Sequence, residues 1–447
     1  MKKFRQLSLI LAFALVVSLF AGCSPAGETS APSAPASSAG ASSSEAPSSQ
    51  EEPSGEVTKV LFASSQWEEA GFSDFYKMMS EKFHEQYPQY EIEEVYLPYA
   101  QYWDKMIADI AAGEPADLMQ QNIPRIPQFI KLGQLQALDD YMTPEVKEAF
   151  QKNYLPAQNE WPIVTDGKTY ALSMMLTSHQ LMYNKKLLDD AGVAVPTTPE
   201  EFVDACKKLT KLPNQYGYGF ATLSEDAFYN DIMIWCMGLD ANVLKDGEFK
   251  INTPESAKAL TLYKELFDAE VSPLGVPKST YRQMFAQGQI AFLIDGPWTM
   301  SFLKTENAEV AANINVAMVP FPTKNSAIAD NILVIPTDAK NKEGAWKYME
   351  MCAGEEAQTQ FAEMTNTTPG WNGAVSDKYM TENEWFHAYV EGAPYAIPSS
   401  PMNHLDLDTQ IRKVVIDQAQ AILYNNAPVE ETLDAIQKEV DELIANE

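Results

Sequence analysis

The sequence predicts an α/β protein with two lobes, and three observations carry that prediction. Residues 57–447 are long enough for two folded domains at about 100–200 residues each. Hydrophobic residues make up 45% of the chain and aromatic residues 11%, so the chain can fill large cores. Strand and helix signals alternate along the folded part, which indicates sheets covered by helices.

The alternation begins just after residue 56. Residues 57–63 (VTKVLFA) form a short apolar run that suits a buried strand. Apolar side chains then recur at helical spacing until a proline ends the pattern (Phe75, Met78, Met79, Phe83, Tyr87 and Pro88). Residues 91–96 predict a second strand, and residues 102–112 predict a helix that ends at Gly113.

A third strand and helix complete a βαβαβ order. Residues 116–119 predict a brief buried strand, and residues 127–132 predict a helix closed by Gly133. This order is typical of a parallel sheet with helices on both faces.

Later elements are marked by turns and caps. Asp166-Gly167 predicts a two-residue hairpin turn, and a second Asp-Gly follows at residues 246–247. Thr198, followed by Pro and two Glu, is predicted to be the N-cap of a helix. Thr253-Pro254 predicts a second helix start of the same kind. An apolar stripe predicts the last helix (Val429, Leu433, Ile436, Val440 and Leu443).

The N-terminus has the pattern of a secretory signal. Three basic residues precede an apolar stretch at residues 7–21, which is too short to span a bilayer as a helix. The stretch ends Phe20-Ala21-Gly22-Cys23, which resembles the lipobox of bacterial lipoproteins, with Phe20 where Leu is usual. The resemblance implies that residues 1–22 are removed and that Cys23 carries a diacylglyceryl anchor; ordinary secretion with a spare Cys23 thiol is the alternative.

Residues 24–56 predict a disordered tether. This segment holds 11 Ser, 7 Ala, 5 Pro and 5 Glu, and it has no aromatic or branched aliphatic residue with which to build a core. Signal, acylated Cys23 and tether together place the folded part just outside a cell membrane, and they favour a Gram-positive surface. The other cysteines (Cys206, Cys236 and Cys352) lie among apolar neighbours and are expected to be buried free thiols rather than a disulfide.

Charge and missing motifs exclude several functions. With 32 Lys+Arg against 62 Asp+Glu the net charge is −30, which argues against binding to nucleic acid or to anionic lipid through a basic surface. The sequence has no Gly-x-Gly-x-x-Gly, P-loop, Cys-x-x-Cys, His-Glu-x-x-His or Gly-x-Ser-x-Gly motif. Glu384 and His387 could form half a metal site, but a solvated surface pair is the simpler interpretation. We therefore expect no enzyme activity, no cofactor and no metal.

Several blocks in a fixed order resemble one family. They are residues 111–118 (AAGEPADL), residues 166–172 (DGKTYAL) with residues 182–187 (MYNKKL), residues 285–291 (FAQGQIA), and residues 295–298 (DGPW), then residues 316–322 and 342–358. These blocks resemble the extracellular solute-binding proteins of bacterial ABC transporters, the family that includes maltose-binding proteins. Ser173 departs from the pattern, because Pro is frequent there.

The resemblance implies a two-lobe, type II periplasmic-binding-protein-like fold. Each lobe would be a mostly parallel sheet flanked by helices, with the ligand in the cleft between lobes. Lobe one would hold residues 57–172 and 323–365, and lobe two residues 173–322 and 366–447. A monomer would capture a carbohydrate, most simply an oligosaccharide, and hinge closure would present it to the transmembrane subunits of an ABC permease.

Loops that combine aromatic and polar residues are the expected ligand site. Aromatic faces cover the C–H faces of sugars, and polar side chains pair with hydroxyls. Trp67, Trp298 and Trp371 would stack, and Asp117, Asn122 and Asn372 would bind hydroxyls. The complete expected set is Gln66, Trp67, Asp117, Asn122, His179, Trp235, Trp298, Trp371 and Asn372. Core packing is the alternative for each Trp, helix capping is the alternative for Asp117, and Trp103 and Trp346 are assigned to packing.

Other functions stay open at the level of sequence. Abundant carboxylates would allow a surface glycoside hydrolase, which new reducing ends would reveal. The same fold could also take a peptide, a polyamine or a metal complex. A polyamine suits the acidic chain, although solubility explains the charge more simply.

Overall fold

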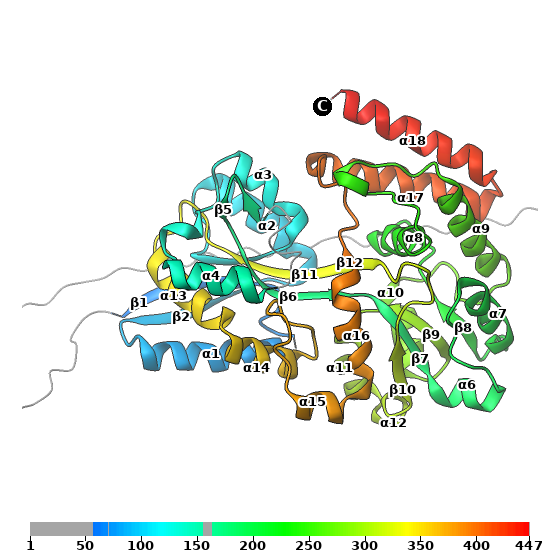
Figure 1. The fold of residues 1–447 in the computed structure, drawn as a ribbon, viewed down its shortest axis with the longest axis horizontal. Helices are drawn as coiled ribbons and strands as arrows, with labels where there is room; N and C mark the ends of the chain where they lie inside the picture. Colours follow the sequence, from blue (N-terminus) through cyan, green and yellow to red (C-terminus); the bar gives the residue numbers. More distant parts are fainter. Residues whose placement is uncertain (1–56, 70, 155–162, 447) are drawn as a thin grey trace, which may run out of the picture. The chain divides into compact units, whose positions relative to one another are not determined.

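A computed structural model describes residues 57–69, 71–154 and 163–446 (Figure 1). The expected signal, the lipobox with Cys23 and the tether lie outside the described residues. Within the described part, no helix has the length and apolar character needed to cross a membrane.

The first sheet contains six strands. Its order is β12-β11-β3-β1-β2, and β6 also pairs with β11. β1 is parallel to both β2 and β3, as the βαβαβ pattern predicts, whereas β11 runs antiparallel to β3 and β6. The strands are β1 (Thr58–Ser64), β2 (Tyr90–Tyr96), β3 (Leu118–Gln121), β6 (Leu172–Ser178), β11 (Ser326–Val334) and β12 (Ala396–Ile397).

Helices cover both faces of this sheet. Phe62 of β1 packs in a core cluster with residues of α1, α13 and α14, while its neighbour Ala63 belongs to a cluster with residues of α2 and α3. Successive strand residues point to opposite faces, so one strand supports two cores. The helices are α1 (Phe72–Gln86), α2 (Tyr99–Ala112), α3 (Ile126–Lys131), α4 (Pro144–Asn153), α13 (Lys342–Ala353) and α14 (Glu355–Thr365).

The second sheet is more mixed than the predicted parallel pattern. Its order is β10-β7-β9-β8, and only the β8–β9 pair is parallel. β7 directly continues the crossing strand β6, so its direction is set by the first sheet rather than by a βαβ unit. The strands are β7 (Gln180–Asn184), β8 (Tyr216–Gly219), β9 (Ile290–Asp295) and β10 (Ile314–Ala317).

Eleven of the described helices surround or follow this second sheet. The largest buried cluster among the described residues joins strand residues such as Phe292 to α7, α8, α9, α17 and α18. The helices are α6 (Lys185–Ala191), α7 (Pro199–Leu209), α8 (Asp226–Gly238), α9 (Pro254–Asp268), α10 (Lys278–Ala286), α11 (Trp298–Glu306), α12 (Ala308–Ala311), α15 (Asp377–Glu382), α16 (His387–Gly392), α17 (Asp408–Asn425) and α18 (Val429–Ala445).

Local turn and cap signals act largely as predicted. Asp166 (φ 53°) and Gly167 (φ 73°) form the turn between β4 (Val164–Thr165) and β5 (Lys168–Thr169). Thr198 Oγ1 accepts the Glu201 backbone N–H at 3.2 Å, which caps α7. The second Asp-Gly differs, because residues 245–247 form a 3₁₀ turn and no strand pair. The short 3₁₀ helices are η1 (Ile123–Arg125), η2 (Leu138–Asp140), η3 (Lys245–Gly247), η4 (Glu384–Phe386), η5 (Ala393–Tyr395) and η6 (Leu405–Leu407).

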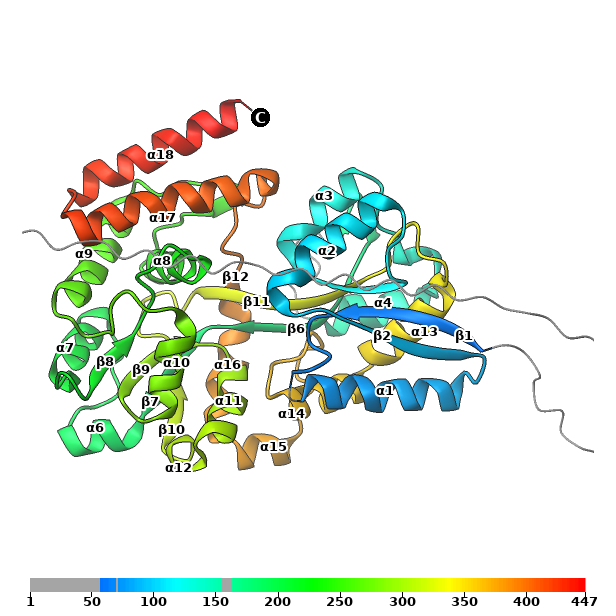
Figure 2. The same ribbon diagram turned by 180° about the vertical axis from the view of Figure 1, so that it is seen from behind.

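Two strands connect the sheets. β6 and β11 pair antiparallel and run side by side from the first sheet toward the second in both ribbon views (Figures 1 and 2). Their register shifts between Asn331 and Ile332, where Met174 is the extra residue of a bulge in β6. Cys206, Cys236 and Cys352 are buried free thiols, as predicted.

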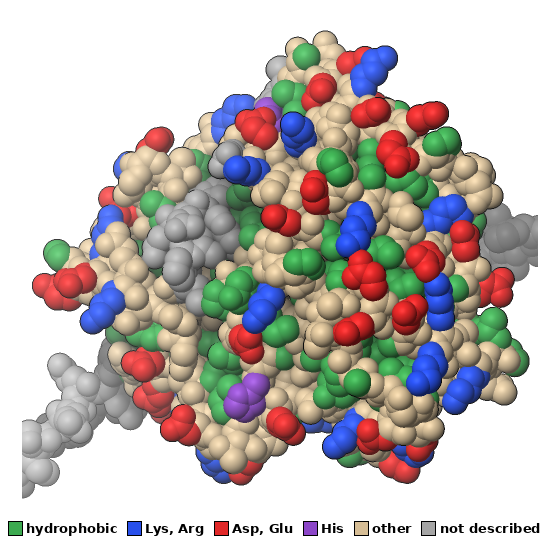
Figure 3. Space-filling model, turned by 45° about the vertical axis from the view of Figure 1, so that its right-hand side comes forward, with side chains coloured by type: hydrophobic (Ala, Val, Ile, Leu, Met, Phe, Trp, Pro, Cys, Tyr) green, Lys and Arg blue, Asp and Glu red, His purple; other side chains and the backbone are tan. Residues whose placement is uncertain are grey.

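The surface drawn in Figure 3 carries charged side chains of both signs. On the face drawn in Figure 3, acidic and basic side chains lie interspersed rather than gathered by sign. Among the described residues, no group of three or more His, Cys, Asp or Glu side chains is arranged to hold a metal ion.

Candidate functional site

A deep cleft with a volume of about 1360 Å³ lies where the two sheets meet. One wall comes from the β1–α1 loop, from the segment after β3 and from Ile107 of α2. The facing wall comes from α8, α10, α11 and α17, and the crossing strands β6 and β11 contribute residues between them. The cleft is therefore built by both lobes, where ligand sites commonly form.

Gln66 reaches the cleft from the loop after β1. Its side chain is largely buried at 7% exposure, and its Oε1 accepts hydrogen bonds from Asn331 Nδ2 and from the Tyr76 hydroxyl. Beside it, Gln120 Oε1 accepts from the Ser64 hydroxyl at 2.7 Å. Because the carboxyl ends of parallel strands meet at one edge of a sheet, these amides share one wall.

Asn122 lines the cleft just after β3. Its Nδ2 donates to the backbone oxygen of Asp330 at 2.7 Å, and the Ile123 N–H donates to Asp330 Oδ2 at 2.6 Å. Burial raises the pKa of Asp330 to about 6, although both hydrogen bonds oppose that shift. This pair ties the first lobe to the crossing strand β11.

His179 and Trp298 meet on the other side of the crossing strands. Their rings are 5.6 Å apart in an edge-to-face arrangement, and both line the cleft. His179 Nδ1 lies 2.9 Å from the Ala327 carbonyl oxygen, so Nδ1 carries the proton, because a carbonyl only accepts. Burial and the charge of Lys278 lower the pKa of His179 to about 4, which leaves Nε2 as an acceptor at neutral pH.

Lys278 and Arg282 are cleft residues that the sequence analysis missed. Arg282 donates to Asp295 through Nε at 2.6 Å and through Nη2 at 2.8 Å, and Lys278 Nζ lies 3.3 Å from the same carboxylate. Burial alone would raise the pKa of Asp295, but the two cations hold it far below its usual range. The i, i+4 spacing on one helix was the available signal.

Arg412 is a second missed residue, on α17. Its guanidinium lies 4.4 Å from the Tyr229 ring, and it donates to Asp408 at 2.7 Å and to Ser400 at 2.9 Å. Asp408 and Arg412 line the cleft together with Asn230 of α8. This wall offers a charged and hydroxyl-rich surface to a polar ligand.

Four of the nine expected ligand residues line the cleft: Gln66, Asn122, His179 and Trp298. Trp67 does not, because it turns back under β1, is 1% exposed, and donates its Nε1–H to the Phe62 backbone oxygen at 2.9 Å. Trp235 is fully buried in the second lobe, where its ring packs 5.0 Å from that of Phe321. We therefore leave both out of the proposed site.

Asp117 also lies away from the cleft lining. One of its oxygens accepts the Leu61 N–H at 3.0 Å, and the other accepts the Lys340 and Asn341 N–H groups at 2.8 Å each. It joins β1 to the start of α13 instead of capping the helix that follows it. This satisfied, 2% exposed carboxylate is structural, and we leave it out of the site.

Trp371 and Asn372 lie in a loop beside α4. The Trp371 ring contacts Tyr154 at 5.6 Å and packs against the first-lobe core, and Asn372 donates its N–H to the Asn153 backbone oxygen at 2.7 Å. Neither residue is among those that line the cleft. Trp103 and Trp346 are buried, as their assignment to packing expects.

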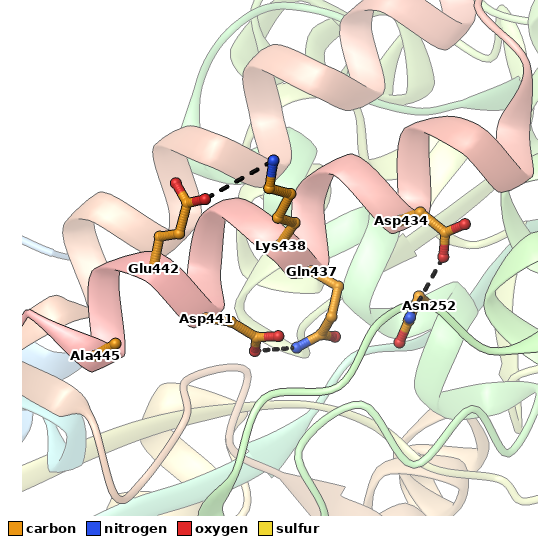
Figure 4. Close-up of a pocket in the computed structure, with 7 residues that line it drawn as sticks. All are labelled: Asn252, Asp434, Gln437, Lys438, Asp441, Glu442 and Ala445. Carbon is orange, nitrogen blue, oxygen red and sulfur yellow. Dashed lines mark hydrogen bonds and ion pairs between the residues drawn. The ribbon is translucent and has the colours of Figure 1, made fainter.

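A smaller hollow of about 340 Å³ lies along α18 (Figure 4). Its polar side chains already bind one another: Gln437 donates to Asp441 at 2.8 Å, and Lys438 lies 3.9 Å from Glu442. The hollow therefore presents a solvated helix surface, and we assign no ligand to it.

Comparison with known proteins identifies the family. A family model for bacterial extracellular solute-binding proteins matches residues 78–388. A binding protein of Brucella abortus is 27% identical over 311 residues, which cover 66% of this chain and 73% of that protein. The maltodextrin-binding protein of Bacillus subtilis is 22% identical over 302 residues, which cover 63% of this chain and 69% of that protein.

Solved structures share the fold. An ABC transporter solute-binding protein of Thermotoga lettingae, bound to α-D-tagatose, superposes with a TM-score of 0.74 at 24% identity, covering 87% of this chain and 99% of that one. The similarity supports the two-lobe type II fold with its intervening cleft. Because the family model spans more than half of the sequence, this chain belongs to the bacterial extracellular solute-binding proteins, which bind ligands for transporters and are not enzymes.

Proposed function

We propose that this protein captures a carbohydrate outside the cell and delivers it to the permease of an ABC importer. The observation that carries the proposal is the cleft of about 1360 Å³, whose lining combines amide, hydroxyl and charged side chains with a tryptophan. Sugars need this combination, because they present C–H faces and a rim of hydroxyls. The Bacillus subtilis relative is named for binding maltodextrin, and the Thermotoga lettingae structure holds a sugar.

Four cleft residues have distinct roles in this proposal. Trp298 stacks on a sugar ring, and His179 Nε2 accepts a hydrogen bond from a sugar hydroxyl, because the Nδ1–H donates to the Ala327 carbonyl oxygen. Gln66 and Asn122 pair with hydroxyls from the opposite wall. A ligand that touches both walls stabilises the closed arrangement of the lobes.

Closure is proposed to occur about the crossing strands. Residues 57–172 and 323–365 would move as lobe one, and residues 173–322 and 366–447 as lobe two. The bulge at Met174, opposite Asn331 and Ile332, interrupts the β6–β11 ladder and supports bending there. The closed form would then dock on the transmembrane permease subunits as a monomer.

The chain is further proposed to be lipid-anchored through Cys23 at the extracellular face of the membrane. A diacylglyceryl group supplies the two acyl chains that stable anchoring needs. Replacing Cys23 by Ser should release the protein from the membrane fraction into the medium. Retention of the Cys23→Ser protein on membranes would contradict the anchor and leave the binding function untouched.

Thermal unfolding with a ligand panel tests the binding function. Ligand at about 100 times its Kd adds about 2.7 kcal/mol to the free energy of unfolding, which raises Tm by a few degrees. We expect a shift with one series of mono- or oligosaccharides and none with amino acids, peptides or polyamines. A shift confined to a peptide or polyamine would keep the fold and overturn the carbohydrate.

A further inference from the structure

One stretch of the cleft wall presents two cations, and the carboxylate that both of them contact lies behind them. Lys278 and Arg282 line the cleft from α10, and the neighbouring lining residues of α11 are Trp298, Ser301, Phe302 and Thr305. The carboxylate that holds both cations, Asp295, is fully buried behind them at the end of β9. A ligand in the cleft therefore contacts the Lys278 and Arg282 side chains and not the Asp295 carboxylate behind them.

Asp295 is saturated by its present partners. Arg282 occupies both of its oxygens, the Gly296 N–H donates to Oδ1 at 2.9 Å, and Lys278 approaches Oδ1 at 3.3 Å. An Arg–carboxylate pair with two parallel bonds is already complete. Arg282 alone neutralises the charge of Asp295, so Lys278 adds a second positive charge beside the same carboxylate.

Two other carboxylates lie near this stretch, but neither pairs with the Lys278 ammonium. Asp231 lies behind the wall, where it accepts the Ala221 N–H at 2.9 Å, and burial raises its pKa to about 6. Glu225 lines the cleft and accepts the backbone N–H of Lys278 at 3.3 Å. Among the described residues, Asp295 is the one carboxylate within ion-pair distance of Lys278 Nζ.

The other cations of the cleft are engaged differently. Arg412 donates to Asp408, Ser399 and Ser400, and Lys413 pairs with Asp417. Arg125 lies 4.6 Å from the Trp103 ring. Lys278 stands apart, because its partner carboxylate is shared with a better-placed arginine.

We propose that Lys278 and Arg282 bind the anionic group of an acidic saccharide, most simply the carboxylate of a uronate. The inference rests on the proposed carbohydrate function and specifies its ligand. With the carboxylate at Lys278, a hydroxyl can donate to His179 Nε2, and the Trp298 ring borders the same space. Three recognition elements for one uronate ring thus lie together on α10, on α11 and at His179, the residue between β6 and β7.

Isothermal titration of the full mature protein tests the proposal. The probes are di- and trigalacturonate, their neutral counterparts galactobiose and galactotriose, galactose 6-phosphate, and the sugar-free dicarboxylate succinate. We expect the galacturonates to bind at least about tenfold more tightly than the neutral sugars, with an affinity that falls as salt is raised.

Variants assign the effect to Lys278. Lys278→Gln should lower galacturonate affinity about tenfold and thereby remove the preference over neutral sugar, while Lys278→Arg should retain the preference. Lys264→Gln is the matched control, because Lys264 is also in a Lys–Asp pair and is 18% exposed against 19% for Lys278, but it is on α9 outside the cleft lining. Thermal melting of each variant verifies that it is folded.

The outcomes separate the two proposals. Equal affinity for neutral and acidic sugars, unchanged by Lys278→Gln, would overturn the anionic subsite and leave the carbohydrate receptor standing. Binding of succinate through Lys278 with no saccharide bound would keep the anionic subsite and overturn the carbohydrate function. A preference for galactose 6-phosphate would keep the subsite and overturn the uronate. No binding by any probe would overturn both.

Discussion

Two buried aspartates, one in each lobe, show how a carboxylate can serve the fold or the cleft. Asp117, just before the first lobe's β3, is 2% exposed, and Asp295, at the end of the second lobe's β9, is fully buried. Asp117 accepts three backbone N–H groups and the Asn341 side-chain amide. Asp295 accepts one backbone N–H and is otherwise held by Arg282 and Lys278.

The kind of partner explains the difference in role. Backbone N–H groups are neutral and fixed by the fold, so Asp117 uses its charge to join β1 to the segment before α13. Arg282 and Lys278 are charged side chains that Asp295 holds in place, and both of them line the cleft. A buried carboxylate that accepts hydrogen bonds from backbone N–H groups therefore indicates a structural role. A buried carboxylate that is paired with cations of the cleft indicates a preorganised binding site.

Replacing Arg282 by Met is expected to have the largest effect on stability. The change removes two charged hydrogen bonds and leaves the buried Asp295 with Lys278 and Gly296 alone. Breaking a buried ion pair from one side costs about 3–5 kcal/mol, so chemical denaturation should show a loss of that size. Lys278→Met is the control, with an expected loss of about 1 kcal/mol because the bidentate pair survives. Equal losses in the two variants would contradict the assigned division of roles.

Asp117→Ala is expected to be the next most damaging change. It leaves three backbone N–H groups without their acceptor, and unsatisfied buried donors cost about 1–3 kcal/mol each. Because water can enter part of the space, we expect a total loss of about 3 kcal/mol in the free energy of unfolding. Ligand affinity should be unchanged in the folded fraction. A large affinity loss at full folding would return Asp117 to the binding site.

Local sequence signals predicted the elements, because their causes are local. The Asp166-Gly167 turn, the Thr198 cap and the Gly113 helix end each depend on the conformational preference of one or two residues. Direction of pairing in the second sheet is a different matter. β7 is the continuation of β6, so its antiparallel pairing with β9 follows from a chain crossing that no local pattern reports.

Chain topology made part of the cleft lining predictable. Gln66 and Asn122 follow strands whose ends meet at one sheet edge, and both reach the cleft. Trp67 follows the same strand one residue later, yet its ring turns into the core, because side-chain direction in a loop depends on tertiary contacts. Lys278 and Arg282 have the pattern of a solvated helix face, and only the position of α10 at the cleft gives them a role.

The pH dependence of stability tests the environment of His179. Its pKa is about 4 in the folded protein against about 6.5 unfolded, so the unfolded chain binds more protons here between those values. Stability contributed by His179 should therefore rise with pH from 4 to 6.5, by about 2–3 kcal/mol. The measurement is the difference in denaturation free energy between the native protein and His179→Gln across that range. The buried acids affect the free energy of unfolding of both proteins equally and cancel in this difference. A difference that does not change with pH would show that His179 is not buried beside Lys278.

The smallest expected effect separates the two half-buried tryptophans that the sequence could not distinguish. Trp298 lines the cleft beside His179, whereas Trp371 packs against Tyr154 and the first-lobe core. Trp298→Ala should lower saccharide affinity about tenfold, or about 1.4 kcal/mol, because ring stacking contributes about that much. Trp371→Ala should lower Tm while leaving affinity within about twofold, since its ring has no part in the cleft. The measurement is a titration of both variants with the saccharide that gives the largest shift in the thermal panel. Equal losses of affinity in Trp371→Ala and Trp298→Ala would contradict this assignment. They would mean that closure brings the Trp371 loop onto the ligand and that the site extends toward α4.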